Sequence, residues 1–152
     1  SQFYASHPAD TLFDAPAVIG GPWSGWKEHI RSPLGEVRDG VAHNGTDIDT
    51  LKVQREIYAP SQGIIVSVQD GYANGVRQYN GNAQRGNFVL YQHLTPGITW
   101  RAGDTISAGE VIARTGWSGL CYSSHPGGTG EHLHLEQYFG TTQVDPYKNM
   151  GS

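Results

Sequence analysis

The segment Gly130-Glu131-His132-Leu133-His134-Leu135-Glu136 places two imidazoles, two carboxylates and two leucines within seven residues near the end of a 152-residue chain. In a β-strand alternate side chains share a face, so the two histidines would lie on one face and the two leucines on the other. One face would then carry polar chemistry while the other packs in the core, and Glu136 is expected on the leucine face as a structural residue. An isolated His-x-His pair is equally typical of an ordinary half-exposed strand, so its meaning depends on partners elsewhere in the sequence.

The composition fits one mainly β domain. Of the residues, 37% are hydrophobic and 16% charged, and a chain of 152 residues can bury a core without disulfides or structural metals. Glycine (21), proline (8) and tyrosine (8) are frequent, and few apolar residues recur at helical spacing. This pattern favours short strands joined by many turns over a helical bundle.

Charge and cysteine content exclude several classes of protein. The net charge of -4 and the isoelectric point near 5.9 argue against a nucleic-acid partner, which would require clustered Lys and Arg. The single cysteine, Cys121, excludes an internal disulfide and a Cys-x-x-Cys zinc knuckle, and we expect it to be a small structural side chain. No apolar run is long enough to predict a membrane span.

Residues 1–29 predict an irregular lead-in that packs on the domain. They contain three prolines and no sustained period, and a short helix is expected only over residues 9–13. Trp23 and Trp26 could wall a substrate groove, but large aromatic side chains more often cover the open end of a small sheet.

From residue 30 onward short apolar runs alternate with turn residues, which predicts one β domain over residues 30–149 and a frayed tail at residues 150–152. The expected strands and turns are 56–58, 63–69, 86–94, 103–106 and 109–114. The β-branched run in 63–69 indicates a buried strand. The polar, glycine-rich residues 72–85 predict a long exposed loop or flexible hairpin at the edge of a groove.

A turn at Asn44-Gly45 separates His43 from Asp47. In an extended chain these two residues would lie roughly 13 Å apart, too far to share one ion easily. A helical turn would bring them together, but Asn-Gly-Thr is a poor helix interior. We therefore expect a tight bend, for which Asn-Gly is a strong signal, and it would let both side chains converge.

Four imidazoles and one carboxylate are candidates for a single site: His43, Asp47, His93, His132 and His134. Two neutral imidazoles and a carboxylate form a typical catalytic zinc set, with the fourth position left to a water whose pKa falls to about 7. The chain has no His-Glu-x-x-His helix, so a histidine would have to act as the base. The same three-ligand set also occurs in non-haem iron oxygenases, although their first pair is usually closer in sequence.

The spacing of these residues resembles a known family. His43-x-x-x-Asp47 together with His132-Leu133-His134 is similar to the paired signature of the lysostaphin-like, LytM-type or M23 zinc endopeptidases, which hydrolyse peptide bridges or stems of bacterial peptidoglycan. The resemblance extends from about residue 30 to 147 and includes Ile30-Arg31-Ser32-Pro33-Leu34-Gly35, Ala59-Pro60, Tyr91-Gln92-His93-Leu94, Gly103-Asp104, Gly109-Glu110-Val111-Ile112 and Val144-Asp145-Pro146. Each motif is weak alone, but their order and spacing are specific.

The resemblance implies a compact antiparallel β-sandwich with a groove walled by loops. It makes His43, Asp47 and His134 the ligands of one Zn²⁺ per chain, His132 the general base and His93 its partner in orienting water or stabilising the tetrahedral intermediate. It further implies a peptidoglycan peptide as substrate and an extracellular or cell-envelope location, and we expect a monomer.

Two features differ from the usual family pattern. The segment before His93 looks shortened, and the loop over residues 117–130, which contains Cys121 and His125, looks longer than the common glycine-rich approach to His-x-His. That loop is expected to border the groove. An inactive LytM-type module that binds or regulates the cell wall is the alternative, although all the matched ligands are present.

Overall fold

The computed structural model describes residues 19–70, 74–81, 86–116 and 132–152. The predicted helix at 9–13 and the predicted loop at 117–130, with Cys121 and His125, lie outside these residues. Within the described part of the chain, no helix has the length and apolar character needed to cross a membrane.

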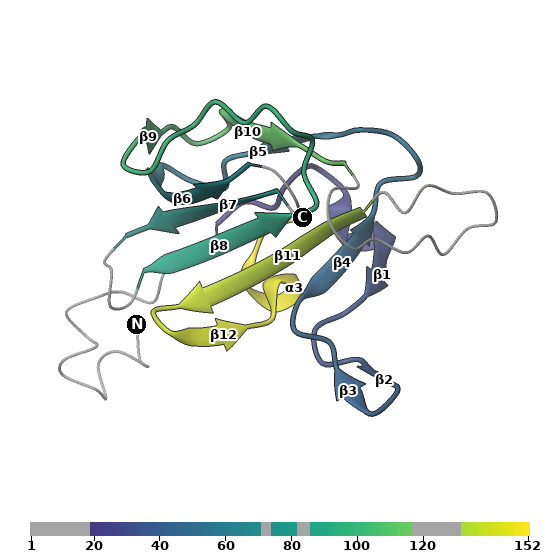
Figure 1. Cartoon of the computed structure of the whole chain (residues 1–152). Helices are drawn as coiled ribbons and strands as arrows, with labels where there is room; N and C mark the ends of the chain where they lie inside the picture. Colours follow the sequence, from purple (N-terminus) through teal and green to yellow (C-terminus); the bar gives the residue numbers. More distant parts are fainter. Residues whose placement is uncertain (1–18, 71–73, 82–85, 117–131) are drawn as a thin grey trace, which may run out of the picture.

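The fold is built on one antiparallel sheet of eight strands (Figure 1). In pairing order these are β1 (Ile30–Ser32), β4 (Thr46–Asp49), β11 (His132–Phe139), β8 (Asn87–Gln92), β7 (Gly75–Asn80), β6 (Gly63–Gln69) and β9 (Thr105–Ile106), with β12 (Thr142–Val144) paired to β11. The predicted mainly antiparallel β fold is therefore confirmed.

Smaller elements complete the fold: a pair of strands formed by β5 (Glu56–Tyr58) and β10 (Val111–Arg114), a hairpin formed by β2 (Val37–Arg38) and β3 (Val41–Ala42), the 3-10 helix η1 (Trp26–His29) and the short helix α3 (Pro146–Asn149). Helix α3 begins at Pro146 because Asp145 accepts a hydrogen bond from the backbone N–H of Tyr147 and proline tolerates the first helical position.

The core lies between one face of the main sheet and the β5–β10 pair. Leu133 and Leu135 of β11, Ile48 of β4 and Tyr91 of β8 are fully buried and share one cluster with Ile57 of β5. Full burial of each leucine side chain contributes about 1.5–3 kcal/mol. The two leucines of the opening segment thus anchor β11 in the core, as their alternation predicts.

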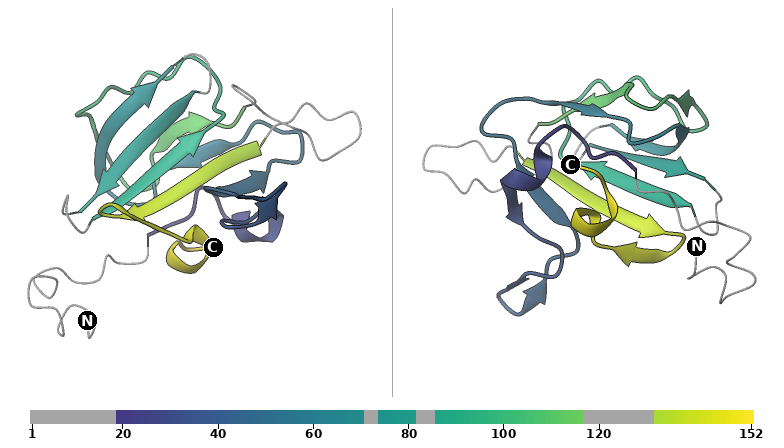
Figure 2. Two further views of the ribbon diagram at one scale, coloured as in Figure 1. Left: turned by 60° about the horizontal axis from the view of Figure 1, so that its bottom comes forward. Right: turned by 180° about the vertical axis from the view of Figure 1, so that it is seen from behind.

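The two ends of the described chain are joined. The indole N–H of Trp26 donates to the carbonyl of Gly151 at 2.6 Å, and Ile19 forms a parallel bridge with Met150. In Figure 2 the purple start of the described chain accordingly lies beside the yellow C-terminal segment. Met150 is only 1% exposed, and Trp23 and Trp26 belong to the core cluster. The prediction of a frayed tail at 150–152 is therefore wrong for its first two residues, because contacts with a segment distant in sequence hold them.

Two further predictions are corrected in the sheet. Only Ile65 of β6 is fully buried, whereas Ile64 and Val66 are 41% and 40% exposed, because the register shifts after Ile65 and only one face of the strand meets the core. Residues 75–80, predicted as part of a long exposed loop or flexible hairpin, form the internal strand β7. Its side chains Gln78 and Asn80 are buried and hydrogen-bonded to each other, so their polarity does not mark exposure.

The anchored tail has a measurable consequence. We expect Met150→Ala to lower the free energy of unfolding by about 2–5 kcal/mol, because it removes a fully buried side chain and leaves a cavity. Urea denaturation measures the change. Val37→Ala, at a side chain that is 66% exposed, should change the free energy by less than about 0.5 kcal/mol. A change in Met150→Ala as small as that in Val37→Ala would contradict the anchoring of the tail and support a frayed end.

Candidate metal centre

The register of β11 against its two neighbours determines which polar side chains meet. His134 lies opposite Asp47 of β4 and opposite Gln92 of β8, and His132 lies opposite Asp49. Residues directly opposite in an antiparallel ladder point to the same face of the sheet. Asp47, His132 and His134 therefore share the face opposite the leucine core, which we call the site face.

The bend before β4 brings His43 to the same place. The side-chain amide of Gln143 on β12 donates to the carbonyl of Asn44 at 2.6 Å and fixes the bend from outside. Gly45 is required there, since a Cβ atom would lie 2.5 Å from the His134 ring. The Nε2 atom of His43 consequently lies 3.3 Å from a carboxylate oxygen of Asp47.

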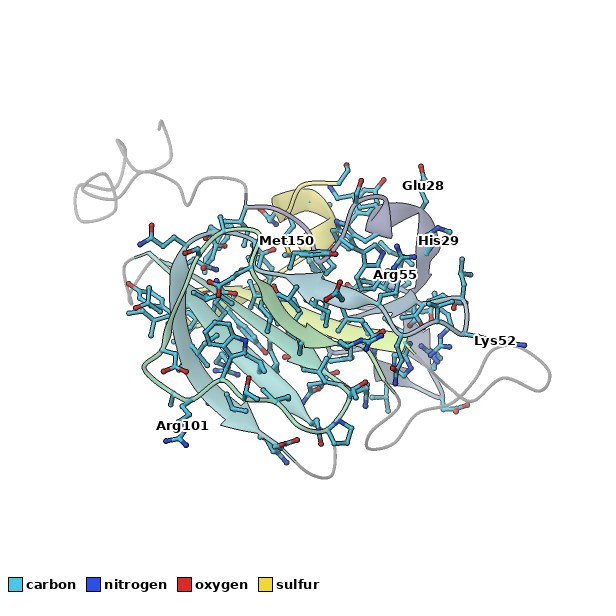
Figure 3. The ribbon with its side chains drawn as sticks, turned by 90° about the horizontal axis from the view of Figure 1, so that it is seen from above. Glu28, His29, Lys52, Arg55, Arg101 and Met150 are labelled. Carbon is cyan, nitrogen blue, oxygen red and sulfur yellow. The ribbon has the colours of Figure 1, made fainter. Side chains whose placement is uncertain are left out.

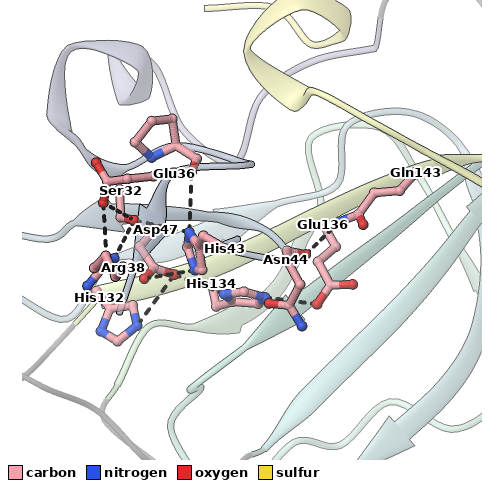
Figure 4. A network of polar contacts seen from close by, with 11 residues as sticks. Ser32, Glu36, Arg38, His43, Asn44, Asp47, His132, His134, Glu136 and Gln143 are labelled. Atoms are coloured by element: carbon pink, nitrogen blue, oxygen red, sulfur yellow. Dashed lines mark hydrogen bonds and ion pairs between the residues drawn. The ribbon is translucent and has the colours of Figure 1, made fainter. Parts of the chain in front are cut away.

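Three side chains of the site face could hold one metal ion (Figure 4). One ligand atom from each of His43, Asp47 and His134 lies within 4.8 Å of the other two. The Nδ1 atom of His134 is 2.9 Å from Oδ1 of Asp47, and both residues are buried. Two imidazole nitrogens and one carboxylate oxygen in this arrangement form a donor set suited to zinc or another divalent transition metal.

His132 and His93 lie beside this cluster. The Nε2 atom of His132 is 3.6 Å from Oδ1 of Asp47, and its ring centroid is 4.7 Å from that of His93. In a regular strand His93 would share the core face with Tyr91. Its backbone φ of 64° instead lies in the left-handed region and turns the ring toward the site face. The structure thus brings together all five residues that the sequence nominates.

Glu136 completes the surroundings of His134, and its predicted place on the leucine face is wrong. Its Oε2 atom lies 2.8 Å from Nε2 of His134, and it accepts a short hydrogen bond from the hydroxyl of Tyr138. The physical reason is the two-residue period of β11, which puts 132, 134 and 136 on one face. A carboxylate that accepts the Nε2–H of a histidine leaves Nδ1 as the metal-binding atom.

His43 is oriented in the same way by residues that the sequence reasoning missed. Its Nδ1 atom is 3.1 Å from the hydroxyl of Ser32, which itself donates to Glu36 at 2.9 Å. Arg38 donates to the same Ser32 oxygen and forms an ion pair with Glu36 at 3.0 Å. The network favours a proton on Nδ1 and leaves Nε2 of His43 to face Asp47. These partners come from β1 and the β2–β3 hairpin, and no motif in the sequence marks them.

Opposing charges set the protonation of the cluster in the metal-free chain. Burial disfavours the imidazolium of His134, but hydrogen bonds to Asp47 and Glu136 outweigh it and raise the pKa from 6.5 to about 9. Burial also opposes ionisation of Asp47 and Glu136, yet contact with His134 holds the pKa of both carboxyls below their ordinary values. A metal ion at this site would have to displace this proton, because a ligand imidazole binds in its neutral form.

Comparisons with known proteins agree with this geometry. Residues 41–146 match the family model described as peptidase family M23. No curated protein matches the sequence.

Several solved structures share the fold. A zinc-containing peptidase from Vibrio cholerae aligns with a TM-score of 0.67 and 25% identity over 90% of this chain, although the chain spans only 41% of that protein. The catalytic domain of a mutant of EnpA, a prophage-encoded M23 protein from Enterococcus faecalis, aligns with a TM-score of 0.61 and 23% identity. The alignment covers 88% of this chain and 95% of that domain. The catalytic domain of the antimicrobial peptidase lysostaphin from Staphylococcus simulans aligns with a TM-score of 0.56 and 24% identity. The alignment covers 77% of this chain and 85% of that domain.

In the metal-free chain we expect His134 to titrate near pH 9 and not near 6.5, because two carboxylates hold its proton. Since its folded-state pKa exceeds the unfolded one, the proton stabilises the fold fully below pH 6.5, and this contribution is lost as the pH rises through about 9. Long-range ¹H–¹⁵N NMR on chelator-treated protein measures the titration. Glu136→Gln should lower this pKa, whereas Glu28→Gln on η1 should not. Titration of wild-type His134 near 6.5 would contradict the assignment.

Proposed function

The chain belongs to peptidase family M23, and from the geometry of its metal centre we propose that it is a zinc endopeptidase that hydrolyses peptide bonds in the cross-bridges or stem peptides of bacterial peptidoglycan. The observation that carries the proposal is the convergence of His43, Asp47 and His134, whose ligand atoms lie within 4.8 Å of one another. We place the enzyme outside the cell, in the cell envelope or on a phage particle, where this substrate is accessible.

The residues of the site fit one zinc ion per chain. Two imidazoles and one carboxylate form a three-ligand set, and each imidazole is oriented by a second polar group, Ser32 for His43 and Glu136 for His134. Zinc bound in such a set keeps one position for water and lowers the pKa of that water to about 7.

His132 and His93 supply the proton chemistry of the proposed reaction. His132 lies at the edge of the cluster, 3.6 Å from Asp47, and we assign it as the base that takes a proton from the attacking water and returns it to the leaving amine. His93, whose ring centroid lies 4.7 Å from that of His132, orients the water or stabilises the developing oxyanion. No glutamate base is needed in this scheme.

The alternative is an inactive LytM-type module that binds or regulates the cell wall. The presence of all five site residues favours hydrolysis. A zinc-loaded chain that attaches to purified walls and releases no amino groups would favour the binding module. Oxygen consumption with added Fe²⁺ would instead indicate an iron oxygenase, which the same ligand types permit.

Histidine variants separate ligand from base. We expect His43→Ala and His134→Ala to lose both bound zinc and hydrolysis, because each removes one of three ligands. His132→Ala should retain the zinc while turnover falls by about 10²- to 10⁴-fold, because only the base is lost. Elemental analysis measures the metal, and mass spectrometry of fragments released from walls with different cross-bridges measures cleavage and identifies the bond.

The outcomes of these variants are distinguishable. His29→Ala, in η1 and outside the cluster, is the matched control and should retain both zinc and activity. Loss of zinc in His132→Ala would mean that the roles of the two strand histidines are exchanged. Full hydrolysis by a metal-free chain would contradict the proposed function.

The carboxylate behind His134 provides a further prediction. We expect Glu136→Ala to weaken zinc binding by about 10- to 100-fold, because His134 loses the partner that fixes its ring and tautomer. Competition with a chromophoric chelator measures the affinity. Glu136→Gln keeps an oxygen at the same position and should lose less zinc affinity than Glu136→Ala. Glu110→Ala, which removes an exposed carboxylate outside the site, should bind zinc as tightly as the wild type. Unchanged affinity in Glu136→Ala would exclude the positioning role.

A further inference from the structure

The site face continues beyond the metal centre in two registered rows of side chains. Glu136 of β11 lies opposite Leu90 of β8, which lies opposite Arg77 of β7. The next row consists of Tyr138, Phe88 and Tyr79 on the same three strands. Because residues opposite one another share a face, both rows lie on the same side of the sheet as His134.

The second row is aromatic and open. The rings of Tyr79 and Phe88 are 5.1 Å apart, and Phe88 and Tyr138 are only half-buried. Phe88 and Tyr138 line a shallow pocket of about 390 Å³ together with Arg77 and the β11–β12 turn at Gly140. This pocket lies four residues along β11 from His134, or about 13 Å at the rise of a strand. An extended peptide bridges that distance with about four residues.

Arg77 gives this pocket a positive charge. It is the one Lys or Arg in the sequences of β4, β7, β8 and β11. Its guanidinium lies 5.7 Å from the centroid of the Tyr138 ring, a distance at which the ring face attracts and orients it. A guanidinium held in this way presents a planar set of donors that matches a carboxylate in two parallel hydrogen bonds.

The neighbouring carboxylate, Glu136, interacts electrostatically with Arg77 but forms its direct contacts with other side chains. Glu136 is only 7% exposed, and its two oxygens already contact His134 and Tyr138. Arg77 is half-buried and lines the pocket. The pocket therefore combines one cation with two aromatic surfaces and is suited to a carboxylate next to an apolar group.

We propose that Arg77, Tyr138 and Phe88 form a substrate subsite that binds a free carboxylate of the peptide, about 13 Å along β11 from His134. The inference rests on the proposed peptidase function and narrows its substrate to peptides that carry such a carboxylate, at the chain end or on an acidic side chain. Peptides that have an amidated end and no acidic side chain lack the group and are the poorer substrates.

Matched peptides test the subsite. Two zinc-dependent cleavage series use peptides with a free terminal carboxylate or an acidic side chain, each compared with its amidated counterpart. We expect the wild type to prefer the acid in at least one series by about 10- to 100-fold in kcat/KM, mainly through KM. Arg77→Ala should abolish that preference by lowering kcat/KM for the acid, while kcat/KM for the amide stays the same. Arg77→Lys should recover part of it, and Arg101→Ala, an exposed arginine in the loop before β9 (Figure 3), should behave like the wild type.

The possible failures are distinguishable. Equal cleavage of acids and amides by the wild type, or an equal loss for both in Arg77→Ala, would overturn the subsite and leave the peptidase function intact. If the wild type cleaves nothing, the proposed function fails. Calorimetric titration of the acid and amide peptides into His132→Ala then still tests the subsite, because weaker binding of the amide supports it and equal binding overturns it.

Discussion

The two-residue period of β11, held between β4 and β8, is the constraint on which the rest of the molecule depends. Leu133 and Leu135 on one face are fully buried in the core, while His132, His134 and Glu136 occupy the other. Burial of the leucines fixes the register, and a slip by one residue would move both imidazoles of β11 into the core. The packing energy of the fold and the geometry of the candidate metal centre are therefore set by the same strand.

Polar side chains around the candidate metal centre orient its two imidazoles. Each imidazole of the candidate ligand set, His43 and His134, has one nitrogen directed to Asp47 and the other engaged by a polar partner, Ser32 or Glu136. Such partners fix the ring and its tautomer before any ion arrives, which lowers the reorganisation needed on binding. Because Ser32 belongs to β1 and Glu136 to β11, the sheet itself supplies this preorganisation.

The sequence identifies the members of the site better than their surroundings. His43, Asp47 and the His-x-His pair can be nominated because metal chemistry restricts residue type and spacing, and the mainly β fold follows from turn residues and short apolar runs. Buried polar pairs inside β7 and the contact of Met150 with Ile19 depend on partners that one sequence does not display. Glu136 differs, since strict use of the strand period places it on the histidine face.

His93 shows where a regular strand is insufficient for the proposed chemistry. Continuation of β8 would place its ring on the core side, and the left-handed backbone at this residue redirects it to the site at a cost of about 1–2 kcal/mol. The neighbouring structure holds the strained conformation: the His93 carbonyl accepts from Gly116 at 2.9 Å, and Leu94 is fully buried directly after it. Backbone strain of this kind persists only where the surrounding structure determines it, and it is concentrated at functional sites. The left-handed backbone at His93 is thus the local feature that directs its ring toward His132, the arrangement on which its proposed role depends.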